Sequence, residues 1–128
     1  MEYLTMICDL KNSRQIKNRE ALQYKLIELL KTANEKYKDY LVASFIITLG
    51  DEWQGLLKMD APYEEIISFF KQGLPEDINF YTGIGIGSIT IHNFELTVNQ
   101  LDGPSFYLAR EAIVYAKRLG HRLVILAD

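Results

Sequence analysis

Two aspartates in the sequence stand where carboxylates can act together. Asp9 follows the largely apolar run 4–8, and Asp51 follows the run 45–49 and a glycine. Carboxylate oxygens are the donors that hard divalent cations such as Mg²⁺ and Mn²⁺ prefer. If the two runs are neighbouring strands, Asp9 and Asp51 share one edge of a sheet and can hold such a cation. The alternative is that Asp51 is only a turn residue, because aspartate is common in turns.

The segment around Asp51 predicts a β-hairpin. Two β-type runs, 45–49 and 53–58, flank Gly50-Asp51, and a glycine at the first central position of a two-residue loop suits a type II′ turn. Asp51 then lies at the hairpin tip. Glu52 is a possible third acidic group, but as the next residue of the strand we expect it to point to the face opposite Asp51.

A run of alternating glycines gives the first candidate for ligand binding. Gly83, Gly85 and Gly87 share one face of a predicted strand over residues 78–87, so that face carries no side chains. Something must come close to this backbone, either a packed helix or a ligand, and the sequence leaves both open. The run is not a dinucleotide fingerprint, because no helix follows it directly.

The second candidate for ligand binding is Asp102-Gly103-Pro104, which predicts the start of a helix. A helix N-terminus favours phosphate. The carboxylate of Asp102 would oppose a phosphate there unless a metal ion lay between them.

The elements that position these residues follow from periodicity and from glycine and proline breaks. Helices are predicted from Asn18 as N-cap, from Asp60 as cap, and from Asp102 to Gly120. The order is β-α-β-β-α-β followed by α-β, an α+β chain with a ferredoxin-like core. In that topology the first strand lies beside the hairpin at the sheet centre, which brings Asp9 and Asp51 together. The predicted strands are 3–9, 41–49, 53–58, 78–87 and 122–127.

Composition excludes several classes of protein. A chain of 128 residues with a formal charge of −3 is sufficient for one core, and it has no large basic surface for nucleic acid. No apolar run is long enough for a membrane span, and Glu2 in place of a basic start argues against a signal peptide. Cys8 is the only cysteine, which excludes an internal disulfide and disfavours a zinc site. We therefore expect a cytoplasmic protein with no membrane partner and no direct nucleic-acid binding.

Four segments resemble the SatD family of bacterial and archaeal proteins. They are residues 9–14, 47–57, 83–87 and 102–112, in the same order across nearly the whole chain. The resemblance implies one SatD-like palm domain over residues 1–128. Many relatives are longer, with a C-terminal helix-turn-helix part, and this chain ends before it. The family is linked to a stress and acid-tolerance operon, and the resemblance defines no biochemical activity.

More remotely, the same segments resemble the palm-type catalytic domains of class III nucleotidyl cyclases and diguanylate cyclases. In those domains an Asp at the end of the first strand and an Asp in the hairpin hold two metal ions, which bind a nucleoside triphosphate. The resemblance implies Mg²⁺ or Mn²⁺ on Asp9 and Asp51, with the carbonyl of Leu10 as a further donor. It also implies a homodimer, because the related cyclases build their site between two palm domains.

The residues that assist catalysis in those cyclases are out of register here. Ile47 stands where a base-reading lysine is usual, and Tyr107 and Glu111 stand where an Asn and an Arg are usual. Arg110 is one residue away and is the candidate catalytic residue. The predicted function is a sensor or regulatory domain that binds a nucleotide or phosphorylated small molecule through a divalent metal. The alternatives are an active cyclase-like phosphoryl-transfer enzyme and a non-catalytic protein-interaction module in a stress response.

Overall fold

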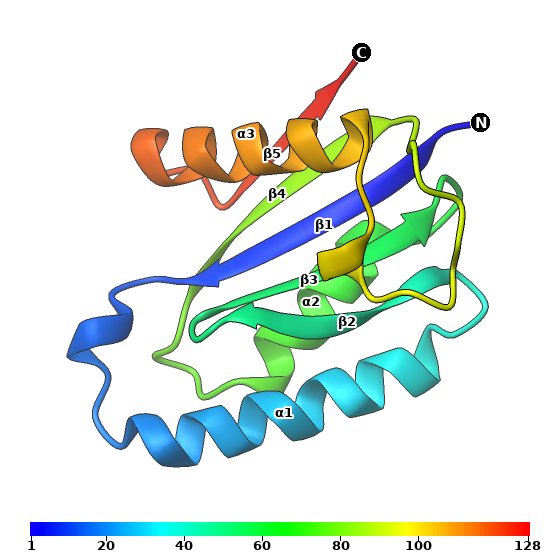
Figure 1. The fold of residues 1–128 in the computed structure, drawn as a ribbon. Coiled ribbons are helices and arrows are strands. Elements are labelled where there is room, and N and C mark those ends of the chain that lie inside the picture. Colours follow the sequence, from blue (N-terminus) through cyan, green and yellow to red (C-terminus); the bar gives the residue numbers. More distant parts are fainter.

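The computed structural model describes all 128 residues, and it contains one five-stranded sheet with helices on both faces (Figure 1). The sheet order is β2-β3-β1-β4-β5. The strands are β1 (Tyr3–Leu10), β2 (Leu41–Leu49), β3 (Glu52–Lys58), β4 (Phe80–Gly87) and β5 (Leu123–Ala127). The helices are α1 (Arg19–Lys36), α2 (Tyr63–Gly73) and α3 (Pro104–Leu119), with short 3₁₀ helices η1 (Ser13–Gln15) and η2 (Val98–Gln100).

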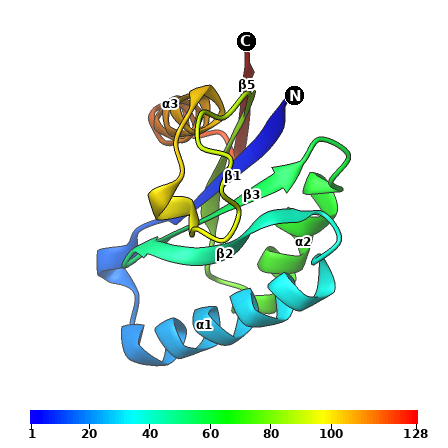
Figure 2. The ribbon, with the colours of Figure 1, turned by 45° about the vertical axis from the view of Figure 1, so that its right-hand side comes forward.

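The topology confirms the predicted α+β fold. β1 lies at the sheet centre, antiparallel to both β3 and β4, and the first six elements form the ferredoxin-like, palm-type core. The last helix and strand extend it, because β5 pairs in parallel with β4. The extension places α3 across the sheet face that α1 and α2 leave open, as Figures 1 and 2 show.

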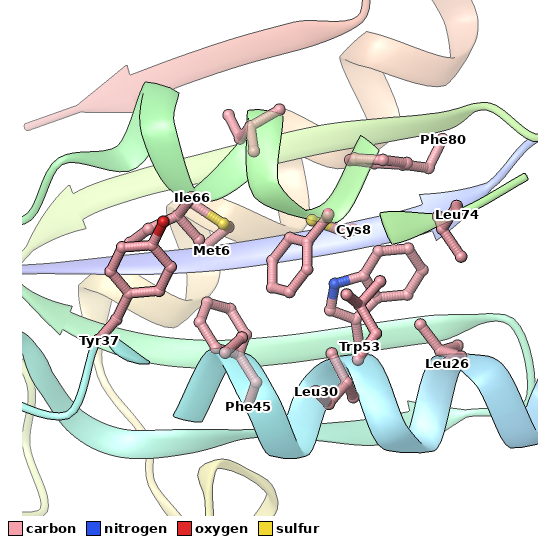
Figure 3. Close-up of a cluster of buried hydrophobic side chains, with 14 of the residues drawn as sticks. Met6, Cys8, Leu26, Leu30, Tyr37, Phe45, Trp53, Ile66, Leu74 and Phe80 are labelled. Atoms are coloured by element: carbon pink, nitrogen blue, oxygen red, sulfur yellow. The ribbon is translucent and has the colours of Figure 1, made fainter. Parts of the chain in front are cut away.

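Alternation along β1 divides the core into two sides. Met6 and Cys8 point to the side of α1 and α2, whereas Ile7 packs with Ala109 and Ile113 of α3. The larger side holds an aromatic cluster between the sheet and helices α1 and α2 (Figure 3). Because Phe70 is fully buried in that cluster, truncating it to alanine should cost about 3–5 kcal/mol of folding free energy.

Two of the predicted helix-end signals, Asn18 and Gly120, are confirmed, and one, Asp60, is not. The side chain of Asn18 caps α1 by accepting from Ala21 N at 3.3 Å, and Gly120 ends α3 in the left-handed region. The prediction of Asp60 as the cap of α2 was wrong, since the helix begins after Pro62. The reason is a tight turn, in which Ala61 N donates to the Lys58 carbonyl at 3.1 Å and ends β3 before the helix starts.

The hairpin is present, but its turn differs from the prediction. Leu49 opposes Glu52, so Gly50-Asp51 is a two-residue loop as predicted. Gly50 is not among the positive-φ residues, which excludes the type II′ turn. The register shifts along β2 include one between Ile47 and Leu49, just before the turn, and such irregularities increase the local twist of a strand. β3 also begins one residue earlier than predicted, at Glu52.

The segment between β4 and α3 is a packed loop. A capping box formed by Thr97 and Gln100 caps the start of η2. Ile89, Val98 and Leu101 belong to a small apolar cluster that also contains Leu56. This loop covers the part of the sheet that α3 does not reach (Figure 2). No helix in the structure combines the length and apolar character that a membrane span requires.

Candidate functional site

Asp9 lies opposite Glu52 in the β1–β3 ladder. Directly opposed residues of an antiparallel pair project from the same face, so the two side chains lie next to each other beneath α3. Both are buried, at 6% and 2% exposure. This partner was not predicted from the sequence, because the hairpin pattern places Glu52 only relative to Asp51. The missing information was the β1–β3 register, which the local sequence of the hairpin does not contain.

Helix α3 supplies a cation to each of these carboxylates. Lys117 Nζ lies 2.6 Å from Asp9 Oδ2, and the Arg110 guanidinium donates to both oxygens of Glu52 at 2.6 and 3.0 Å. Arg110 and Lys117 are seven residues apart, about two helical turns, and so project from the same side of α3. Thr48 Oγ1 donates a further hydrogen bond to Glu52 at 2.6 Å.

The two buried carboxylates differ in their net electrostatic environment. Burial raises the pKa of Asp9, the Lys117 ammonium opposes that rise, and the nearby charges of Asp51 and Glu52 add to it, so the pKa stays above its ordinary value. Burial also acts to raise the pKa of Glu52, but the hydrogen bonds from Arg110 and Thr48 outweigh it and leave the pKa lowered.

Asp51 is placed at the same end of the sheet as Asp9, as the sequence predicted. Its carbonyl accepts from Leu10 N at 3.0 Å, which joins the hairpin tip to the residue after Asp9. Its carboxylate accepts from Ser13 Oγ at 2.8 Å and so is turned toward η1. Arg19 at the start of α1 donates to the Gly50 carbonyl at 2.6 Å and holds the turn in place.

The residues proposed to hold a divalent cation offer suitable oxygens but no preformed cage. Asp9 and Asp51 supply carboxylates, while no group of three or more His, Cys, Asp or Glu side chains gathers in a metal-binding arrangement. Mg²⁺ is commonly held by one or two carboxylates with waters and ligand phosphates completing its shell. Asp9 and Asp51 fit that kind of site, on the condition that Asp9 gives up its contact with Lys117.

The glycine face of β4 is filled by helix α3. A Cβ at Gly83 would lie 2.7 Å from Ile113 Cα, and one at Gly85 would overlap the backbone of Ser105 and Ala109. Ser105 Oγ donates to the Gly85 carbonyl at 2.9 Å and fixes the helix there. Of the two alternatives for Gly83 and Gly85, close helix packing is therefore what the structure has, and no space is left for a ligand beside them.

The start of α3 is also occupied by protein groups. Gly103 has φ of 138° and packs against the backbone of Ile89 and Thr90, where a Cβ would meet Ile89 Cα at 2.5 Å. The first amide of the helix, Ser105 N, donates to the Ser88 carbonyl at 2.9 Å. Asp102 accepts from the Tyr107 hydroxyl at 2.9 Å. The groups around Asp102 and Gly103 thus already have protein partners, which differs from the open anion site that the sequence suggested.

A cavity of about 690 Å³ lies beside the end of β1, between the residues that follow Leu10, the short helix η1 and the start of α1. Its wall combines the loop after β1, the start of α1 and the loop before β4, and it contains three lysines. Lys17 and Lys25 line it without forming an ion pair, whereas the Lys11 ammonium lies 4.6 Å above the Tyr81 ring. The other polar lining residues are Asn12, Gln15, Asn18, Asp77 and Asn79. This cavity was not predicted from the sequence, because its lysines are spread over residues 11–25 and the rest of its wall comes from residues 75–79.

Comparison with solved structures places the fold among cyclase-type palm domains. The GGDEF domain of PA1120 (YfiN or TpbB) from Pseudomonas aeruginosa matches with a TM-score of 0.63 at 14% identity, covering 97% of this chain and 81% of that chain. A bacterial light-regulated adenylyl cyclase matches with a TM-score of 0.60 at 19% identity, covering 97% and 74%.

The monomeric guanylyl cyclase domain of the RhoGC fusion protein from Blastocladiella emersonii is a further match. Its TM-score is 0.60 at 18% identity, covering 88% of this chain and 74% of that chain. At these identities the likeness concerns the fold alone. Comparison with curated proteins gave no match. A family model, however, matches residues 3–120, and by that match the chain belongs to the SatD family.

Proposed function

We propose that this SatD-family domain is a sensor that binds a nucleotide or another phosphorylated small molecule in the cavity between η1, α1 and the loop before β4. The observation that carries the proposal is the charge of that cavity. The chain as a whole has a formal charge of −3, yet the cavity wall holds Lys11, Lys17 and Lys25 against the single carboxylate of Asp77. A basic cavity in an acidic protein favours an anionic ligand.

The size and chemistry of the wall suit such a ligand. Small-molecule sites usually enclose about 300–1,000 Å³, and this cavity is within that range at about 690 Å³. The ammonium groups of Lys17 and Lys25 are free to contact phosphate oxygens. The Oδ1 atoms of Asn18 and Asn79 already accept hydrogen bonds from the protein, but their Nδ2 groups can donate to a base or sugar.

A divalent cation belongs to the proposal as a second component. Asp9 and Asp51 would hold Mg²⁺ or Mn²⁺ at the end of β1, and Ser13, bonded to Asp51, lies between Asn12 and Gln15 of the cavity wall. Such an ion would neutralise phosphate charge and help to orient the ligand. The Leu10 carbonyl remains a candidate third donor.

The hydrogen bonds that Arg110 makes to Glu52 favour a sensor over an enzyme. Both of its terminal nitrogens donate to Glu52, so the guanidinium is not available to stabilise charge on a reacting phosphate in this conformation. An active cyclase-like phosphoryl-transfer enzyme is the alternative, and it requires Arg110 to leave Glu52. Adenylyl and guanylyl cyclase domains are among the solved structures with a similar fold, so this alternative is worth testing.

The test is a panel of nucleotides and inorganic phosphates, each measured by thermal shift with Mg²⁺, with Mn²⁺ and with excess chelator. We expect a triphosphate to raise the melting temperature most strongly when the metal is present. Lys17→Met and Lys25→Met should weaken this response. Lys31→Met is the matched control, because it removes the same charge from an exposed position of α1 outside the cavity.

Each outcome selects one function. Chromatography of the incubated nucleotide shows whether a product forms. A rise in melting temperature without product supports the sensor, and a rise with product supports the enzyme. No response to any nucleotide or phosphate would leave the protein-interaction module. A response that survives both lysine substitutions would place the ligand outside this cavity and contradict the proposal.

A homodimer is a further part of the proposal. Among the similar structures, one is a dimeric and another a monomeric guanylyl cyclase domain, so the fold is compatible with both states. Ultracentrifugation over a concentration series, with and without nucleotide and metal, decides the state. A strict monomer under all conditions would exclude a site shared between two copies.

A further inference from the structure

The buried carboxylates beneath α3 already have counter-ions from the protein. The side chains of Asp9 and Glu52 are 9% and 2% exposed, whereas those of Lys117 and Arg110 are 49% and 50% exposed. The carboxylates are therefore fixed in the sheet, while their cations reach them from a helix surface that is half in solvent. This arrangement allows a cation to leave without moving the strand that carries its partner.

The two ion pairs differ in how firmly they are held. Arg110 makes two parallel hydrogen bonds to Glu52, and Thr48 adds a third. Lys117 makes a single contact, with one oxygen of Asp9. A bidentate guanidinium pair has a fixed geometry, whereas an ammonium on a four-carbon chain is a mobile point charge. Lys117 is thus the member of the pair that can be displaced.

We infer that Lys117 occupies the cation position of Asp9 whenever no divalent ion is bound, so that Lys117 and a metal ion compete for one carboxylate. The inference rests on the proposed function, because it takes Asp9 as a metal ligand. It adds a regulatory role for helix α3, which would set the affinity of the site for metal. Anything that draws Lys117 away from Asp9 would then prepare the site for a metal ion.

Electrostatics gives the size of the competition. An ammonium 2.6 Å from a carboxylate oxygen and a divalent ion on the same carboxylate would repel each other strongly. Removal of the ammonium should therefore raise the affinity of Asp9 for a divalent cation by about tenfold or more.

The experiment is a Mn²⁺ titration of the full chain without nucleotide, in which electron paramagnetic resonance counts the free ion. Lys117→Met removes the charge and keeps the apolar length of the side chain. Lys117→Arg keeps the charge and can pair with Asp9 through two donors. Arg118→Met is the matched control, because it removes the same charge from the next residue of α3, which is exposed and forms no ion pair.

We expect Lys117→Met to bind Mn²⁺ about tenfold more tightly than wild type, Lys117→Arg to bind it no more tightly than wild type, and Arg118→Met to change the affinity less than about twofold. Adding Asp9→Asn to Lys117→Met should abolish the gain. Emission from the single, buried Trp53 verifies that each variant is folded. If Lys117→Met does not fold, tighter binding by Lys117→Gln supports the competition in its place.

Two outcomes would overturn the inference, and they are distinguishable. Equal affinities in wild type, Lys117→Met and Arg118→Met would exclude the competition while leaving Asp9 and Asp51 as a metal site. An absence of Mn²⁺ binding in every variant would remove both the competition and the metal component of the proposed function.

Discussion

Asp9 and Glu52 face each other across the β1–β3 ladder, and helix α3 places one cation on each. Although the two carboxylates are neighbours and both are buried, the pKa of Asp9 is raised and that of Glu52 is lowered. The difference arises from the number of hydrogen bonds, since Glu52 receives three and Asp9 receives one. Removing the charge of Glu52 should therefore destabilise the protein, whereas removing the charge of Asp9 should not.

Glu52→Gln should destabilise the protein at neutral pH by about 1–2 kcal/mol, a value limited by the half exposure of Arg110. Because the folded-state pKa of Glu52 is lowered, its contribution is present above the ordinary pKa and is lost as the pH falls through the folded value. The difference between wild type and variant should accordingly shrink in acid. Urea unfolding followed by Trp53 emission, at neutral pH and in acid, measures both effects.

Asp51→Asn is the matched control for that experiment. It removes the same charge one residue earlier, where the carboxylate is half-buried and accepts only from Ser13. We expect its unfolding free energy to lie within about 0.5 kcal/mol of wild type. Equal destabilisation by Asp51→Asn and Glu52→Gln would show that the Arg110 pair is not what stabilises this end of the sheet.

Asp9→Asn should leave the protein as stable as wild type, or more stable, at neutral pH. The folded-state pKa of Asp9 is raised because burial outweighs the Lys117 contact, so the charged form is disfavoured by folding. As the pH falls through the folded pKa, the folded wild type takes up a proton first, and below the ordinary pKa the side chain is protonated in both states. The advantage of the variant should therefore shrink through the folded pKa and disappear below the ordinary value. The same urea series measures this, and a clear loss of stability at neutral pH would mean that the Lys117 pair dominates.

The placement of Asp9 and Asp51 at one end of the sheet followed from the topology that the order of elements implies. The order itself and the hairpin could be predicted because they depend on local signals. Apolar runs, the Gly50-Asp51 loop, the Asn18 cap and the Gly120 terminator all act within a few residues. These signals established the fold class before any tertiary contact was known.

The remaining features of the site depend on register and packing. Glu52 becomes the partner of Asp9 only through the β1–β3 pairing, and Lys117 reaches Asp9 from 108 residues away in the chain. The Gly83 and Gly85 face could not be assigned to helix or ligand, because a bare strand face accepts either. The choice depended on α3 crossing β4, which no local pattern encodes.

Cys8 should be unreactive in the native protein. Burial raises the pKa of its thiol to about 12, and its sulfur lies 3.5 Å from Thr82 Oγ1 within the central strand. The thiolate is the reactive form, so a disulfide reagent near neutral pH should modify Cys8 only when β1 opens. The measurement compares the modification rate in buffer and in denaturant, and rapid reaction in buffer would contradict the tight packing of β1.

The same substitution should have a large effect on stability at one glycine and almost none at another. Gly85→Ala inserts a Cβ into the backbone of Ser105 and Ala109, so α3 must move away from β4, at an expected cost of about 1–3 kcal/mol or more. Gly50→Ala meets no atom within 4 Å and has no positive φ, so it should change stability by less than about 0.5 kcal/mol. Because α3 carries Lys117, its displacement should also weaken the Asp9 contact, and Gly85→Ala should bind Mn²⁺ more tightly than Gly50→Ala does. Calorimetric unfolding of the two variants checks the stability ranking. Equal stabilities would show that the glycine face is not what seats α3 on the sheet.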